Sequence, residues 1–180
     1  YNGIKYNGEL SSEEGMLMLD KDFFDVFETR FLAGSPEVFN TAENALVTES
    51  FARRNGMEEV IGTRLIDGKK EFIIAGIIEN FNGSVFDNFE VILNGKLNAG
   101  KRSNQTTSSV MTFIKVSKGT DIKDLEANIE NHVLKFMNHS RFRGAKPVTL
   151  IRLDELYFSE INDGMMGLKC ENIDKVFILS

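Results

Sequence analysis

The chain has 180 residues and a formal net charge of −6, and 42% of its residues are hydrophobic while 27% are charged. This composition is typical of a folded globular protein and excludes a disordered one, and the length suffices for one medium domain or two small ones. The basic residues occur as short pairs, Arg53–Arg54, Lys69–Lys70 and Lys101–Arg102, rather than as a continuous positive surface. We therefore predict no nucleic acid partner, because such a partner requires that surface.

The two ends of the chain indicate a piece of a longer protein. It begins Tyr1-Asn2-Gly3, without a Met or a signal-peptide pattern, and it stops while still apolar at 175–180. No apolar run reaches the roughly 18 residues of a membrane span. Cys170 is the only cysteine, so neither an internal disulfide nor a cysteine metal pair is expected.

The first forty residues alternate short apolar segments with turn residues. Residues 1–15 predict an edge strand or a loop, and 15–19 predict a strand. A short helix follows over 22–27, capped by Asp20 or Asp22, and its Phe23, Val26 and Phe27 share one face. Residues 29–33 are expected to be extended and to end at Gly34-Ser35-Pro36.

The strand around which we build the fold is 71–81, where isoleucines and phenylalanines are bounded by turn chemistry on both sides. Gly76 in its middle indicates a bulge or a close backbone approach. Residues 62–66 are expected to form a hairpin with it through Asp67-Gly68.

Residues 45–47 form a further strand in this prediction, leading into a helix over 48–56 with Thr48 as N-cap and Gly56 at its end. Residues 89–93 are predicted as another strand. These elements, with short hairpins and no regular alternation of strand and helix, favour an α+β fold.

A polar connector is predicted over 98–109, followed by a strand over 110–117. The clearest helix starts at Thr120 or Asp121 and carries an apolar stripe at helical spacing. The stripe consists of Ile122, Leu125, Ile129, Val133, Phe136 and Met137. Residues 147–153 and 174–179 are predicted as strands, and 154–158 as a turn of helix or an extended arm.

No set of residues predicts chemistry, and we predict no catalytic residue, no cofactor and no metal ligand. His132 and His139 lie seven positions apart, whereas metal-binding pairs on a helix are three or four apart. One group is a candidate for contact with a partner, because its apolar side chains surround the polar turn at Asn82; core packing around a loop is the alternative. The group is Phe81, Val85, Phe86 and Phe89.

Five segments, in order along the chain, carry a resemblance. They are Leu19–Phe27 with Phe31–Gly34, then Ala45–Ala52, Ile61–Leu65, Phe72–Phe81 and Leu153–Ser159. They resemble motifs of MacB-like periplasmic core domains, such as "D-x-D-F-F-x-V-F", "V-L-T-E-S-x-A" and "L-x-D-I-Y-L-x-S". These domains are the extracytoplasmic insertions of FtsX/MacB-type ABC transporter permeases.

The resemblance implies two subdomains. Residues 1–40 and 104–180 would form a discontinuous porter-like α/β subdomain, and residues 41–103 a small mixed α/β subdomain inserted in it. The segments Phe39–Glu43 and 98–109 would then be the hinge between them.

The resemblance also implies a function, which is a non-enzymatic domain that transmits conformational change outside a bacterial inner membrane. Transmembrane helices flanking this chain would anchor it, and the ATPase would be a separate cytoplasmic domain or subunit. Its partners would be a second permease copy, that cytoplasmic ABC ATPase, and a periplasmic partner or exported substrate, with the isolated domain a monomer. The alternative is a freestanding secreted enzyme or small-ligand-binding protein.

Overall fold

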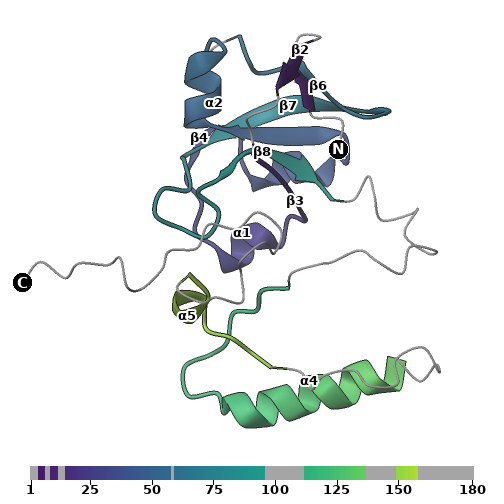
Figure 1. The fold of residues 1–180 in the computed structure, drawn as a ribbon, viewed down its shortest axis with the longest axis vertical. Coiled ribbons are helices and arrows are strands. Elements are labelled where there is room, and N and C mark those ends of the chain that lie inside the picture. The colour runs from purple at the N-terminus through teal and green to yellow at the C-terminus, as the bar shows by residue number, and fades with distance from the viewer. Residues whose placement is uncertain are drawn as a thin grey trace, which may run out of the picture.

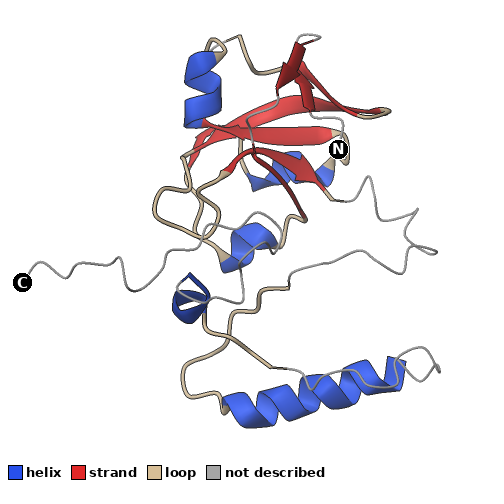
Figure 2. Ribbon diagram, in the orientation of Figure 1, coloured by secondary structure: helices blue, strands red, loops and turns tan. Residues whose placement is uncertain are grey.

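The computed structural model describes residues 4–6, 9–11, 15–57, 59–95, 112–136 and 149–157 (Figure 1). These residues form the α+β fold that the sequence predicts, with a curled sheet and short helices (Figure 2). The strands are β1 (Ile4–Tyr6), β2 (Glu9–Ser11), β3 (Gly15–Leu19), β4 (Phe31–Ala33), β5 (Asn44–Thr48), β6 (Arg64–Asp67), β7 (Lys70–Ile78) and β8 (Phe89–Asn94). The helices are α1 (Phe23–Val26), the 3-10 helix η1 (Pro36–Asn40), α2 (Glu49–Arg54), α4 (Ile122–Phe136) and α5 (Leu153–Tyr157).

The eight strands form one mixed sheet in the order β2-β1-β6-β7-β5-β8-β3, with β4 paired to β7 outside this path. The pairs β5–β7 and β3–β8 are parallel, and the other pairs are antiparallel. Residues 1–40 contribute β1 to β4, and residues 41–103 contribute β5 to β8. The predicted boundary at residue 40 therefore does not coincide with a break in the sheet, and the division into two subdomains stays a prediction.

The strand predicted over 71–81 is present as β7, which ends at Ile78 and lies in the middle of the sheet. It pairs with β6 through the turn after Asp67, where Gly68 has φ +62°, and this confirms the predicted hairpin. Gly76 lies at a register shift against β5, and a Cβ on it would lie 2.7 Å from the carbonyl oxygen of Ala33. Both the bulge and the close approach predicted for Gly76 are therefore present, and glycine is required there because the neighbouring backbone leaves no room.

The connection from β5 to α2 also follows the prediction. Thr48 Oγ1 accepts a hydrogen bond from the Phe51 amide at 3.4 Å, which satisfies one free N–H of the first turn. Helix α2 then places Phe51 and Ala52 on one face of the sheet, and Gly56 has φ +85° after the helix ends. The larger core lies on this face and comprises Ala45, Val47, Phe51, Ala52, Val60, Leu65, Phe72, Ile74, Ile77, Val91 and Leu93.

A second core lies on the opposite face of the sheet and includes Phe39, from the segment that was predicted as a hinge. Phe39, Leu46, Ile78 and Ile92 are buried together there. The buried side chain of Asn94 donates from Nδ2 to the carbonyl oxygens of Phe39 and Thr41 at 2.8 and 2.9 Å. The Ile73 amide also donates to the Glu43 carbonyl at 2.8 Å. The hinge predicted at Phe39–Glu43 stays a prediction, and in this structure its backbone is hydrogen-bonded and the Phe39 ring is buried.

Among the described residues after 95, two predicted helical segments are confirmed and two predicted strands are not formed. Helix α4 begins where predicted, and Asp121 Oδ1 accepts from the amides of Lys123 and Asp124 at 2.9 and 3.2 Å. Residues 112–117 are extended but pair with no strand among the described residues, and 149–152 likewise form no strand. Apolar alternation alone was misleading, because a strand also needs a neighbouring strand to bind its backbone.

Helix α5 confirms the predicted turn of helix after residue 153. In Figure 1, α4 lies at the opposite end of the molecule from the sheet, with α5 between them. The predicted connector at 98–109 and the strand at 174–179 lie outside the described residues, as do Cys170 and His139.

Candidate functional site: an aromatic cluster beside the sheet

The candidate contact residues lie in the loop that joins β7 to β8. Ser84 folds this loop by donating from Oγ to the Phe81 carbonyl at 2.7 Å and accepting from the Phe86 amide at 3.1 Å. Gly83, between them, has φ +68°. A serine hydroxyl that bonds neighbouring backbone in this way stabilises a turn. The result is a closed turn that directs Val85 and Phe86 into the molecule, where both are buried.

The start of this loop is attached to two other elements. Asn80 Oδ1 accepts from the Ser50 amide at 2.9 Å, so the loop contributes to the N-terminus of α2. Arg30 Nη1 lies 3.1 Å from Glu79 Oε1, and the Glu79 amide donates to the Arg30 carbonyl at 2.9 Å. The ion pair is exposed to solvent, where such pairs contribute little. The loop is therefore positioned mainly by backbone hydrogen bonds and by apolar packing.

Phe86 is the centre of the packing. Its ring centroid lies 5.1 Å from Phe27, 5.3 Å from Phe23, 5.6 Å from Phe113 and 5.7 Å from Phe81. Most of these rings meet edge to face, an arrangement that adds about 0.5–1.5 kcal/mol per pair beyond the area buried. We call this the aromatic cluster: Phe23, Val85, Phe86 and Phe89, with Leu17, Leu19, Phe24, Phe27, Phe81, Phe113 and Leu156 packed against it.

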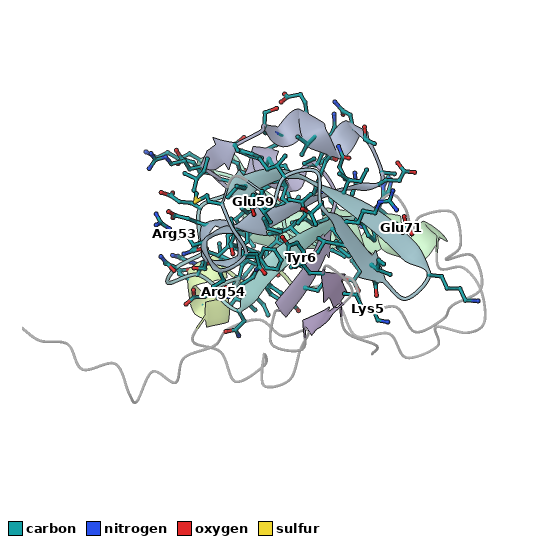
Figure 3. The ribbon with its side chains drawn as sticks, turned by 90° about the horizontal axis from the view of Figure 1, so that it is seen from above. Lys5, Tyr6, Arg53, Arg54, Glu59 and Glu71 are labelled. Atoms are coloured by element: carbon teal, nitrogen blue, oxygen red, sulfur yellow. The ribbon has the colours of Figure 1, made fainter. Side chains whose placement is uncertain are left out.

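Figure 3 shows Tyr6 from above together with charged side chains, of which it labels Lys5, Arg53, Arg54, Glu59 and Glu71. The Tyr6 ring packs edge-on against Phe51 with centroids 5.4 Å apart, and its hydroxyl donates to the Asn55 carbonyl at 3.5 Å. Arg53 pairs with Glu49 in the same helix, and Arg54 pairs with Glu90 of β8. The two arginines therefore bind carboxylates of their own chain.

In the part of the chain that the structure describes, the titratable groups with shifted pKa values lie on the surface. The hydrogen bond from Ser35 lowers the pKa of Glu37, and the hydrogen bond between Arg152 and Asp154 lowers the pKa of Asp154 and raises that of Arg152. Among the described residues, no group of His, Cys, Asp and Glu is arranged to hold a metal ion. No helix in the described part of the chain is both long and apolar enough to cross a membrane.

Comparison with known proteins identifies the family. The model of the MacB-like periplasmic core domain matches residues 2–132. The chain belongs to this family. The resemblance of the five sequence segments is therefore confirmed, and the family is one of periplasmic domains of ABC transporter permeases. No curated protein matches the chain.

Two solved structures have the same fold as this MacB-like domain. One is a domain of a protein described as a permease, from Porphyromonas gingivalis, with a TM-score of 0.59 and 18% identity, covering 83% of this chain and 69% of that one. The other is the periplasmic region of MacB from Actinobacillus actinomycetemcomitans, with a TM-score of 0.54 and 12% identity, covering 89% of this chain and 71% of that one. At these identities the likeness establishes the fold.

In this MacB-like domain the four predicted contact residues come together, but they face inward. Val85 and Phe86 are 3% exposed and Phe89 is 6% exposed, while Phe81 is half-buried. Packing around a loop, the alternative that the sequence left open, describes these side chains in the structure. Direct contact between these residues and a partner stays a prediction, and Phe81 is the member of the four that is partly exposed in the structure.

The predicted contact group contained four members of the aromatic cluster and left out seven, among them Phe113 and Leu156. A signal was present for Phe113, because side chains alternate between the two faces of a strand such as the one predicted over 110–117, and Phe113 is then opposite Ile114 and Val116. Leu156 gave no such signal, since it lies in a helix too short to show a periodic pattern.

Proposed function

We propose that this chain is the periplasmic domain of an ABC transporter permease and that it transmits conformational change, without catalysis, between the membrane part and molecules outside it. The family match over residues 2–132 carries the proposal. The fold shared with the periplasmic region of MacB supports it.

A non-catalytic role agrees with the chemistry of the described residues. An enzyme brings titratable groups with shifted pKa values together in a pocket. Here the shifted groups are Glu37, Arg152 and Asp154, all at the surface, and their shifts come from hydrogen bonds to neighbours along the chain. Packed apolar side chains dominate the candidate site instead.

The partners follow from this role. We propose that the complete transporter contains a second copy of the permease and a cytoplasmic ABC ATPase. Outside the membrane, the domain meets an exported substrate or a periplasmic protein. Movement of one copy against the other would then follow the nucleotide state of the ATPase, as in other domain-closure mechanisms. The isolated domain would be a monomer in solution, since the membrane part would supply the main contacts between copies.

Location and movement can be tested together in the complete transporter. A single cysteine replaces Lys118, which is exposed, in a background with Cys170→Ser. In cells with a permeabilised outer membrane and an intact inner membrane, a membrane-impermeant maleimide should label it. A cysteine placed on the cytoplasmic ATPase is the matched control and should stay unlabelled until the inner membrane is opened.

Movement is then read from the same cysteine in the purified transporter. Spin labels on the two copies should give a distance distribution that differs between the nucleotide-free and ATP-bound states. Labelling that requires an opened inner membrane would contradict the periplasmic location, and identical distances in both states would contradict transmission of conformational change.

A further inference from the structure

We propose that Phe113 and Leu156, packed on the aromatic cluster, form the joint that sets the orientation of α4 relative to the sheet. We define the α4 segment as residues 112–136 and 149–157, and the sheet unit as the described residues before 96. The second part of the proposal rests on the proposed function: a movement of the α4 segment reaches the sheet through this joint.

The two stretches of chain that lead to and from α4 each place one side chain in the cluster. The Phe113 ring centroid lies 5.1 Å from that of Phe27, just after α1, and 5.6 Å from that of Phe86 in the β7–β8 loop. The planes meet at 81° and 71°, so both contacts are edge to face. Leu156 of α5 packs against the same cluster. The α4 segment is therefore attached to the sheet unit at two points that converge on one site.

The neighbours of these two residues point elsewhere. Ile114 and Val116 are both 44% exposed, Ile151 is 42% exposed and Leu153 is 45% exposed. Among the described residues of the α4 segment, Phe113 and Leu156 are the members of the aromatic cluster. The attachment thus depends on two particular side chains rather than on a broad apolar surface.

The stretch that follows α4 is also hydrogen-bonded to the helix. Glu126 Oε1 in α4 accepts a hydrogen bond from the Leu150 amide at 2.7 Å. This bond links the helix to the stretch that leads on to Leu156. Phe113 and Leu156 are therefore both connected to the same helix. A change in the helix position must therefore act on Phe113 and Leu156 together.

On the other side of the joint, the cluster is continuous with the sheet. Phe23 lies 5.6 Å from Phe24 between ring centroids, and Phe24 lies 5.6 Å from Phe39 of the second core. Phe89 begins β8 itself. Close-packed interiors transmit displacement rather than absorb it. A displacement of Phe86 is therefore transmitted through these rings to both faces of the sheet.

The test measures the orientation of α4 in the 180-residue chain. Spin labels are placed at Arg53→Cys on α2 and Asn128→Cys on α4, both exposed, in a Cys170→Ser background. The distance distribution in this parent should be a single narrow peak. The narrow peak should be replaced by a broad distance distribution in Phe113→Ala and also in Leu156→Ala, because each variant lacks one anchoring side chain.

Two matched variants separate anchoring from general damage. Phe113→Leu keeps an apolar side chain at the joint and should retain the narrow peak, and Ile114→Ala truncates the exposed neighbour and should also retain it. Circular dichroism of every variant checks that the sheet unit remains folded, as we expect from the partial exposure of Phe113.

Two outcomes would overturn the proposal: a broad distribution in the parent chain, or a narrow one that persists in both alanine variants. Neither involves nucleotide, membrane or a second copy, so either would leave the proposed function standing. Conversely, failure of the periplasmic labelling would leave the joint standing as a structural feature.

Discussion

The sheet unit and the α4 segment are built on different principles. All the buried apolar side chains of the described residues lie between Phe23 and Leu93, whereas none of the side chains described in the α4 segment is buried. Hydrophobic burial contributes roughly 25 cal/mol per Å², so among the described residues the sheet unit holds nearly all of that stabilisation. The α4 segment depends on the local hydrogen bonds of its helix and on the aromatic joint.

This difference indicates what each part contributes. A close-packed sheet moves as a rigid body, because small changes in a dense core are costly. A 15-residue helix is marginal by itself in water. We infer that the sheet unit provides shape and that the α4 segment provides adaptability.

The largest expected effect is a core truncation in the sheet unit. Phe72→Ala removes a fully buried ring in β7 and should lower the free energy of unfolding by about 3–5 kcal/mol, through lost burial and a new cavity. Ile73→Ala, on the next residue of the strand but 45% exposed, is the matched control and should cost about 1 kcal/mol or less. Urea unfolding followed by circular dichroism measures both. Equal losses would contradict the assignment of the buried face.

The next effect concerns the close approach at Gly76. Gly76→Ala would place a Cβ 2.7 Å from the Ala33 carbonyl oxygen and 2.8 Å from Leu46 Cδ2, so the backbone must shift. We expect a loss of about 1–3 kcal/mol in unfolding free energy, as in other overpacked cores. Gly68→Asn is the control, because that turn has open space and Asn adopts positive φ readily. A neutral Gly76→Ala would show that β4 does not pack against β7 as described.

A third effect tests the predicted hinge at Phe39–Glu43. Asn94→Ala leaves the carbonyl oxygens of Phe39 and Thr41 without this donor, at a cost of about 1–3 kcal/mol. Hydrogen exchange at 39–44 should accelerate in this variant. Asn82→Ala, at an exposed loop position, is the control and should leave exchange there unchanged. If exchange at 39–44 were also unchanged in Asn94→Ala, this segment would already be mobile in the parent protein. That result would support the predicted hinge.

The smallest effect lies in the α4 segment. Arg152 binds Asp154 through two hydrogen bonds, from Nε at 2.9 Å and from Nη2 at 2.6 Å, and this lowers the pKa of Asp154. A lowered folded-state pKa gives stabilisation that is present above the ordinary carboxyl pKa and is lost as the pH falls through the folded value. Both groups are exposed, so the contribution to stability should be slight.

Carboxyl NMR titration tests this sign. The pKa of Asp154 should rise toward its ordinary value in Arg152→Gln. A pKa that is the same in both proteins would show that the ion pair is absent in solution.

Local patterns predicted much of the sheet unit. The strand at 71–81, the hairpin at Asp67–Gly68 and the cap at Thr48 were all recognisable, because each depends on residues adjacent in sequence. The α4 helix was recognisable for the same reason. The order of the strands was not, since β3 pairs with β8 across some seventy residues that carry no mutual signal.

The candidate site was predictable only in part. The sequence identified Phe81, Val85, Phe86 and Phe89 as a group, but their inward orientation depends on Ser84 and on rings from α1. The wrong strands at 110–117 and 147–153 had a suitable apolar pattern and lacked a partner strand among the described residues. Phe113 was therefore assigned to a sheet when its contact is with the cluster.

Hydrogen–deuterium exchange of the whole chain tests the central contrast most directly. Amides of β5, β7 and β8 should exchange only through global unfolding, while those of α4 should exchange orders of magnitude faster through local opening. Exchange in α4 should accelerate further in Phe113→Ala while the sheet amides stay unchanged. Equal protection of α4 and β7 would contradict the account, because the two parts would then be one cooperative unit.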